Sequence, residues 1–171
     1  IDRIRKWIDQ GAVDDTPQAG PIYSKDNPPP YIGAPVVAAI DVSPNNQWIA
    51  VAGFHEVLLY QLEDRSLQGR WIGLSPRLES IRFSPSGEYL AAVGGEPGVY
   101  GEIQIWHVAK GELLRSQLLG NDTLNGVAWS PDSKNIAVAL TDQSVRVLDA
   151  LTGQQVAFQR AHEDWPRATV F

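Results

Sequence analysis

Residues 129–139 read WSPDSKNIAVA, and two near copies lie upstream: FSPSGEYLAAVG at 83–94 and VSPNNQWIAVAG at 42–53. In each copy a Ser-Pro pair ends a short strand, a polar turn follows, and a nearly all-apolar strand comes next. Proline has no backbone N–H for a sheet, so we expect it to end the strand before it. The pairs recur at spacings of 41 and 46 residues, as Ser43-Pro44, Ser84-Pro85 and Ser130-Pro131.

Four strand-like segments fit into each repeat from residue 36 onward. A period of about 40–45 residues with four strands per unit is typical of a β-propeller blade. We therefore predict an all-β fold, a partial β-propeller of three four-stranded blades plus the first strand of a fourth. The approximate bounds are 36–76, 77–119 and 120–163 for the blades and 164–171 for the start of the next.

The residue before each Ser-Pro pair is predicted to lie in the core. Val42, Phe83 and Trp129 occupy this position, and Phe171 is its counterpart in the fourth unit. We expect the first three to be buried and Phe171 to be exposed. Trp106 also recurs with the blade period and is predicted to be core.

Residues 1–35 do not follow the repeat. In residues 1–15 the isoleucines at 1, 4 and 8 share one helical face with Trp7, which predicts a short amphipathic helix. Residues 16–35 hold six of the twelve prolines and are predicted to be a stiff linker; an ordered strap on the propeller is the alternative. Because the chain lacks methionine and starts at Ile1, we expect it to be a segment of a longer protein.

Composition excludes several kinds of function. The net charge is −6 and the basic residues are scattered, so we expect no nucleic-acid partner. The chain has no cysteine, which excludes a thiolate metal site, a cysteine nucleophile and covalently attached haem within it. No apolar run reaches the roughly 18 residues of a membrane helix, so no membrane-spanning segment is predicted.

No catalytic, cofactor-binding or metal-binding residue is predicted. The three histidines, His55, His107 and His162, fall in different units and are not expected to converge on a metal. GGEPGVYGE, residues 94–102, is an insertion between the second and third strands of the second unit, where we expect a loop. Glu96 and Glu102 flank it and are expected to be solvated rather than to act as a catalytic pair. Trp165 is the candidate partner-binding residue.

These repeats resemble the WD-repeat family of β-propellers over about residues 36–171. The family's Trp-Asp position is occupied by Tyr60-Gln61, Trp106-His107 and Leu148-Asp149, and Asp142 matches the aspartate of the tight turn between second and third strands. His162 matches the histidine that opens a repeat and would be buried and hydrogen-bonded. The resemblance implies a non-enzymatic scaffold for protein–protein interaction. The alternative is the propeller of an enzyme, either a quinoprotein dehydrogenase or a peptidase that the propeller gates.

The stretch KWIDQGA at 6–12 resembles the last helix of the c-type cytochrome domains that are fused to WD-repeat propellers in planctomycete-type bacterial proteins. The order of helix, proline-rich segment and propeller is also similar. This resemblance implies that residues 1–15 end an upstream cytochrome c-like domain, with haem c in that domain and no cofactor in this segment. It also implies a periplasmic or extracytoplasmic location.

Overall fold

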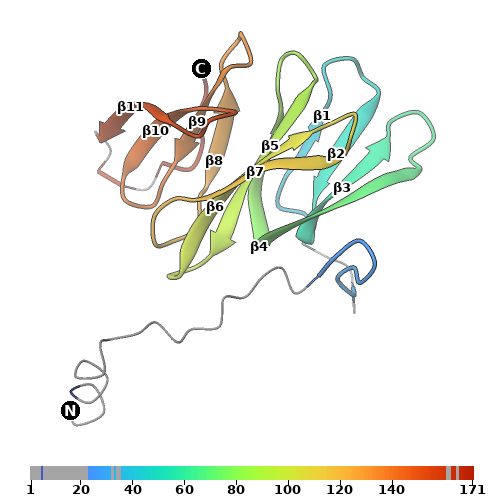
Figure 1. Cartoon of the computed structure of the whole chain (residues 1–171), viewed down its shortest axis with the longest axis horizontal. Helices are drawn as coiled ribbons and strands as arrows, with labels where there is room; N and C mark the ends of the chain where they lie inside the picture. Colours follow the sequence, from blue (N-terminus) through green and yellow to red (C-terminus); the bar gives the residue numbers. More distant parts are fainter. Residues whose placement is uncertain (1–4, 6–22, 32, 34–35, 161–162, 165) are drawn as a thin grey trace.

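A computed structural model describes Arg5 and residues 23–31, 33, 36–160, 163–164 and 166–171 (Figure 1). Apart from Arg5, the helix predicted over residues 1–15 lies outside the described residues, as does part of the proline-rich segment. His162 and Trp165 lie outside them too. The described residues include no helix with the length and hydropathy that crossing a membrane requires.

The described part of the chain forms eleven strands, and strands that follow one another in sequence pair antiparallel within each sheet. Short strands and tight turns follow from the alternation of apolar runs with turn residues. The strands are β1 (Ile40–Val42), β2 (Trp48–Ala52), β3 (Phe54–Gln61), β4 (Leu67–Phe83), β5 (Tyr89–Glu96), β6 (Tyr100–His107), β7 (Glu112–Leu118), β8 (Gly126–Trp129), β9 (Asn135–Ala139), β10 (Ser144–Asp149) and β11 (Gln155–Arg160).

The strands make three four-stranded blades, which confirms the predicted propeller architecture. Blade 3 is the separate sheet β8 to β11, whereas blades 1 and 2 are joined in one seven-stranded sheet, β1 to β7. The joint is β4, which is 17 residues long. Its first part pairs with β3 as the outer strand of blade 1, and its last part, Arg77–Phe83, pairs with β5 as the inner strand of blade 2. The predicted boundary at 76/77 therefore falls inside a continuous strand.

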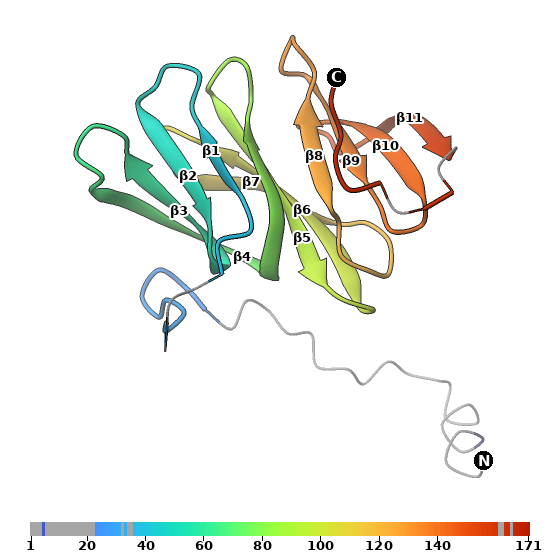
Figure 2. The ribbon, with the colours of Figure 1, turned by 180° about the vertical axis from the view of Figure 1, so that it is seen from behind.

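The fourth unit does not begin with a strand in the described residues. Residues 166–171 run alongside β8 (Figure 2), and Asn125 Nδ2 donates to the Pro166 carbonyl over 3.5 Å. Thr169 Oγ1 donates to the Ala137 carbonyl at 3.3 Å. A strand requires a backbone ladder with a neighbour, and no other described segment forms one with these residues.

Two apolar cores lie between the blades, and blade 2 contributes to both. In β5, Leu90 and Ala92 face the core shared with blade 1, while Ala91 and Val93 face the core shared with blade 3. Successive side chains of a strand point to opposite faces, so a strand covered on both sides must be apolar at every position. This explains the all-apolar second strand of the repeat.

The core predictions hold at three of the four equivalent repeat positions. Phe83 and Trp129 are buried, with 6% and 7% of their surface exposed, and Phe171 is 51% exposed, as predicted. Trp106 is buried as well. The prediction for Val42 is wrong, because this side chain is 41% exposed: no described blade covers its side of β1.

The insertion in the second unit lengthens a hairpin instead of forming a loop. Glu96 pairs with Tyr100 at the ends of β5 and β6, and Val99 N donates to the Glu96 carbonyl at 3.0 Å. Gly94 must be glycine here, because a Cβ atom on it would lie 1.9 Å from the Arg77 carbonyl oxygen. The glycines let a neighbouring strand approach closely, so the ladder continues through the insertion.

Candidate functional site

The Ser-Pro turns are closed by the serine and not by the proline. In all three blades the serine Oγ accepts a hydrogen bond from the backbone N–H five residues later, at 2.9 Å from Trp48, 3.0 Å from Tyr89 and 2.9 Å from Asn135. The serine N–H donates to the carbonyl of the same residue in each case. Ser43, Ser84 and Ser130 are buried, whereas Pro44, Pro85 and Pro131 are exposed.

A left-handed residue occupies the same place in each of these turns. It is Asn46 with φ 55°, Gly87 with φ 74° and Ser133 with φ 61°. Glycine and asparagine adopt this conformation readily, whereas serine does so at some cost. The three turns therefore have one common geometry although their sequences differ, and they hold the ends of the first and second strands at fixed positions.

The turns between third and fourth strands also repeat. Gly111 and Gly153 have φ values of 60° and 69°, and Arg65 takes this place in blade 1 with φ 60°. Asp149 Oδ1 accepts from the Thr152 N–H at 2.7 Å and from Thr152 Oγ1 at 2.8 Å. These hydrogen bonds lower the pKa of Asp149, so the carboxylate stays ionised within the turn.

Asp142 lies in the tight turn between β9 and β10, the place that the WD-repeat resemblance assigns to it. Its carboxylate accepts from the Ser144 N–H at 3.0 Å and from the Ser144 hydroxyl, and Arg146 Nη2 donates to it over 3.0 Å. Burial opposes ionisation, but the hydrogen bonds outweigh it and lower the pKa of Asp142. The residue thus shapes a turn, and its charge is neutralised by a neighbour.

Trp106 belongs to a line of polar groups inside blade 2. Its Nε1 donates to Gln104 Oε1 at 3.0 Å, and Gln104 Nε2 donates to Glu102 Oε2 at 2.8 Å. The Trp106 ring stacks on Trp71 of blade 1, with ring centroids 5.6 Å apart and an interplanar angle of 20°. The Trp106 ring therefore packs blade 2 against blade 1, and its indole N–H is hydrogen-bonded within blade 2.

The prediction for Glu102 is wrong, because this side chain is fully buried. Its carboxylate accepts from the Ser75 N–H at 2.8 Å, from Ser75 Oγ at 2.6 Å and from Ser116 Oγ at 2.5 Å, besides Gln104. Four donors replace the water that a buried carboxylate loses. The signal in the sequence was the alternation E-I-Q-I-W over 102–106, which places three polar or amphipathic side chains on one face of a strand. Glu96 is exposed, as expected.

A second buried carboxylate, Glu56, ties the proline-rich segment to blade 1. Arg70 binds it through two hydrogen bonds, at 2.8 Å from Nε and 2.6 Å from Nη2, and Tyr31 Oη donates to it at 2.8 Å. Arg70 Nη2 also reaches the Pro29 carbonyl at 3.3 Å. Burial raises the pKa of Tyr31, and the hydrogen bond to Glu56 adds to the effect. Sequence reasoning missed this contact because its partners are 14 to 41 residues apart.

His55 and His107 lie in different blades, and His162 lies outside the described residues. His55 lies in β3 and His107 ends β6 in another blade, and burial lowers the pKa of His55. Within the part of the chain that the structure describes, no three residues among histidine, aspartate and glutamate are grouped to hold a metal ion. A carboxylate pair across a cleft, as a glycosidase needs, is excluded for Glu96 and Glu102 because one is exposed and the other is fully hydrogen-bonded inside blade 2.

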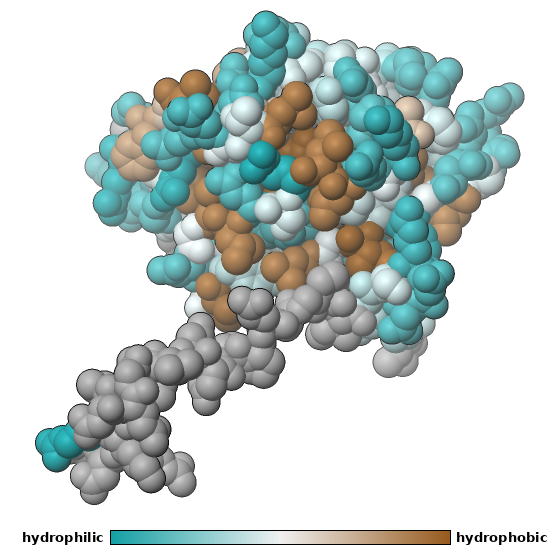
Figure 3. Space-filling model, in the orientation of Figure 1, coloured by the Kyte–Doolittle hydropathy of each residue, from teal (hydrophilic) through white to brown (hydrophobic). Residues whose placement is uncertain are grey.

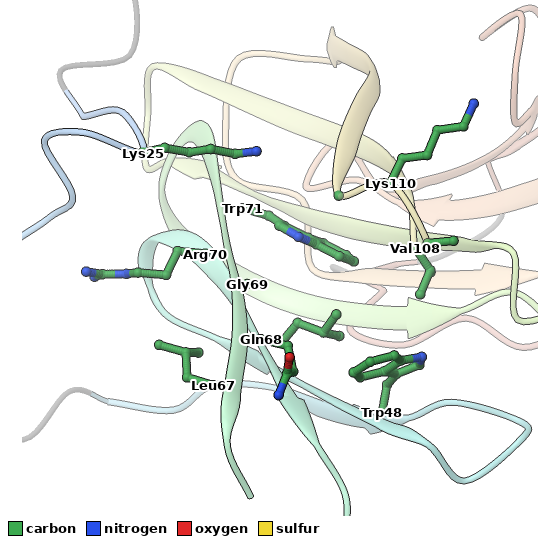
Figure 4. Close-up of a pocket in the computed structure, with 12 residues that line it drawn as sticks. Lys25, Trp48, Leu67, Gln68, Gly69, Arg70, Trp71, Val108 and Lys110 are labelled. Carbon is green, nitrogen blue, oxygen red and sulfur yellow. The ribbon is translucent and has the colours of Figure 1, made fainter.

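A cavity lined mainly by strands and turns of blades 1 and 2 is shown in Figure 4. Its volume is about 570 Å³. The start of β4 and the turn between β6 and β7 form its walls, and Lys25 of the N-terminal segment lies at its edge. Its lining combines cationic, aromatic and aliphatic side chains with one glutamine and two glycines: Lys25, Trp48, Leu59, Leu67, Gln68, Gly69, Arg70, Trp71, Val108, Ala109, Lys110 and Gly111.

Comparisons with known proteins agree with this fold. Residues 111–149 match the WD40 family, described as WD domain, G-beta repeat. The chain is 25% identical over 106 residues to an uncharacterized WD repeat-containing protein of Synechocystis sp., a match that covers 62% of this chain and 30% of that protein. The comparisons thus support a WD-repeat β-propeller. The resemblance of residues 6–12 to a cytochrome helix stays a prediction.

Two solved structures have the same fold. One is the crystal structure of the RRP9 WD40 repeats, with a TM-score of 0.71 and 19% identity over 81% of this chain and 42% of that one. The other is the structure of U3-55K, with a TM-score of 0.72 and 19% identity over 81% of this chain and 43% of that one. The chain therefore spans less than half of each solved chain and about a third of the curated relative it matches.

Proposed function

We propose that this chain is a non-enzymatic scaffold for protein–protein interaction. One observation carries the proposal: the serine at the start of each first-to-second-strand turn closes that turn with the same pair of hydrogen bonds in all three blades. Turns held in this way present their side chains at fixed positions, which lets a partner bind without ordering the loops first.

A retention experiment tests this proposal against the enzyme alternatives. The chain is expressed with haem, a quinone and divalent metals supplied, and its absorbance and metal content are measured after dialysis. We expect no group to be retained in stoichiometric amount, because no thiol is available and His55 and His107 lie in different blades. Stoichiometric retention of any one group would overturn the scaffold proposal and favour a quinoprotein or metalloenzyme propeller.

We further propose that the scaffold is tethered to a c-type cytochrome domain and works outside the cytoplasm. The support is the resemblance of KWIDQGA and the order of helix, proline-rich segment and propeller. Sequencing the gene upstream of Ile1 tests the tether, since a Cys-x-x-Cys-His motif is expected there. An upstream region that encodes no such motif would contradict both the tether and the location inferred from it.

A further inference from the structure

The indole N–H of Trp71 has no acceptor among the described residues, and its nitrogen atom is not fully buried. Only 3% of the Trp71 surface is exposed. The other two tryptophans buried in the blades are satisfied, since Trp106 donates to Gln104 Oε1 at 3.0 Å and Trp129 donates to the Arg82 carbonyl at 2.9 Å. Tyrosine and tryptophan side chains use such a polar tip at binding surfaces, where the ring is covered and the donor stays open. In Trp71 the ring is covered and the N–H remains open toward the cavity that the residue lines.

Two glycines leave the space around this donor open. A Cβ atom on Gly69 would lie 2.9 Å from Trp71 Nε1, and one on Gly111 would lie 2.8 Å from it. Both glycines line the cavity of about 570 Å³ between blades 1 and 2. Because only glycine leaves Nε1 uncovered from both sides, the donor is accessible to an atom that enters the cavity.

The charges around the cavity favour an acidic ligand. Three cations line it, Lys25, Arg70 and Lys110, and none of its lining residues is a carboxylate (Figure 4). Arg70 is already paired with Glu56, so Lys25 and Lys110 are the cations left for a ligand. Neither lysine has an ion pair within the described residues. This local excess of positive charge occurs in a chain whose net charge is −6.

We propose that this cavity binds a carboxylate side chain of an acidic peptide segment from a protein partner. The carboxylate would accept the Trp71 N–H and lie beside Lys110 and Lys25, since charge-assisted hydrogen bonds are the stronger kind. The apolar walls, Trp48, Leu59 and Val108, suit aliphatic neighbours of that residue in the peptide. Two free cations match one or two carboxylates and not a polyphosphate. The inference rests on the scaffold function and names the class of its partner.

Indole resonances provide the test. The chain is labelled with ¹⁵N, and the Trp71 indole signal is identified by its loss in the variant Trp71→Phe. This variant retains an aromatic ring to stack on Trp106 but lacks the N–H donor. The probe is the blocked peptide acetyl-Ala-Leu-Glu-Leu-Ala-amide, and the control peptide has glutamine in place of glutamate. We expect the acidic peptide to shift the Trp71 indole proton to higher frequency and to leave the Trp106 and Trp129 indoles unchanged.

Matched variants sharpen the result. Lys110→Gln should weaken binding about tenfold, since it removes one charged partner. Lys134→Gln, at an equally exposed turn of blade 3, should leave the affinity unchanged. No Trp71 shift at millimolar peptide, an equal shift with the glutamine peptide, or equal affinities of Lys110→Gln and the unmodified chain would each overturn the site.

Failure of the site is distinguishable from failure of the scaffold proposal. A chain that retains no cofactor after dialysis and shows no Trp71 response contradicts this site alone. A chain that retains a cofactor contradicts the scaffold proposal whatever the peptide does.

Discussion

Blade 1 and blade 2 are built from the same repeat, yet their second strands differ in burial. In blade 2, β5 is covered on both faces, and every residue from Leu90 to Val93 is fully buried. In blade 1, β2 buries only Ala50 and Ala52, while Ile49 and Val51 are half-buried. The difference shows that a residue's place in the repeat does not fix its contribution to stability. That contribution depends on whether a neighbouring blade covers the side chain.

Exposed apolar groups show the same contrast on a larger scale. Figure 3 shows apolar side chains gathered in several places on one face of the molecule. Over the described surface, several of the exposed large apolar residues belong to the two outer blades, among them Ile40, Val42, Val156 and Phe158. Burying such groups against another blade would stabilise the fold by about 25 cal/mol per Å².

The largest expected effect comes from the residue before Ser-Pro. Phe83→Ala and Trp129→Ala should each cost about 3–5 kcal/mol of unfolding free energy, because a large ring leaves a cavity between blades. Val42→Ala, at the equivalent position of blade 1, should cost less than about 1 kcal/mol because its side chain is already half exposed. Denaturant unfolding of the three variants measures the values. Equal costs at Val42 and Phe83 would break the comparison between the blades.

The two glutamates of the lengthened hairpin, one buried and one exposed, give the next effect. Glu102→Ala should cost about 2–3 kcal/mol, because it leaves the Ser75 N–H and two hydroxyl donors unpaired inside the blade. Glu96→Ala, a few residues away on the exposed hairpin end, should change stability by no more than about 0.5 kcal/mol. Chemical denaturation of both variants checks this. A cost for Glu102→Ala as small as that for Glu96→Ala would contradict the buried network.

These comparisons of equivalent or nearby residues show which structural features the sequence alone predicts. The repeat itself predicted the blades and the burial of Phe83, because strand period and turn chemistry are local properties. Val42 and Glu102 could not be placed in the same way. Their burial depends on which surface another blade or strand covers, and a pattern within one strand does not record that.

The binding cavity was beyond sequence reasoning for a related reason. Trp71 lies in β4, and Gly111 lies in the turn after β6, 40 positions further along the chain. Only the packing of blade 1 on blade 2 brings both to one cavity. Trp165, the aromatic residue that the sequence favoured for partner binding, lies outside the described residues, so that prediction stands untested.

A smaller effect separates the two residues of the Ser-Pro pair. Ser84→Ala should cost about 1 kcal/mol, since the Tyr89 N–H loses the acceptor that closes the turn. Pro85→Ala should change stability by less than about 0.5 kcal/mol, because the proline is exposed and Ser84 retains its hydrogen bonds. Thermal unfolding of both variants makes the measurement. A larger loss at Pro85 than at Ser84 would mean that the proline ends the strand, as the sequence alone suggested.

The smallest effect concerns Asp142, an exposed residue in the turn between β9 and β10. The pKa of Asp142 is lower in the folded chain than in the unfolded chain, so its contribution to stability is complete above the unfolded pKa and is lost as pH falls through the folded pKa. Acid should therefore weaken the turn between β9 and β10 below about pH 4. Asp142→Asn should reduce the acid dependence of unfolding, whereas Glu63→Gln, at an exposed carboxylate with no hydrogen bond among the described residues, should not. Unfolding followed from pH 7 to pH 3 tests this, and identical acid profiles for Asp142→Asn and the unmodified chain would show that the Ser144 and Arg146 contacts add nothing to the fold.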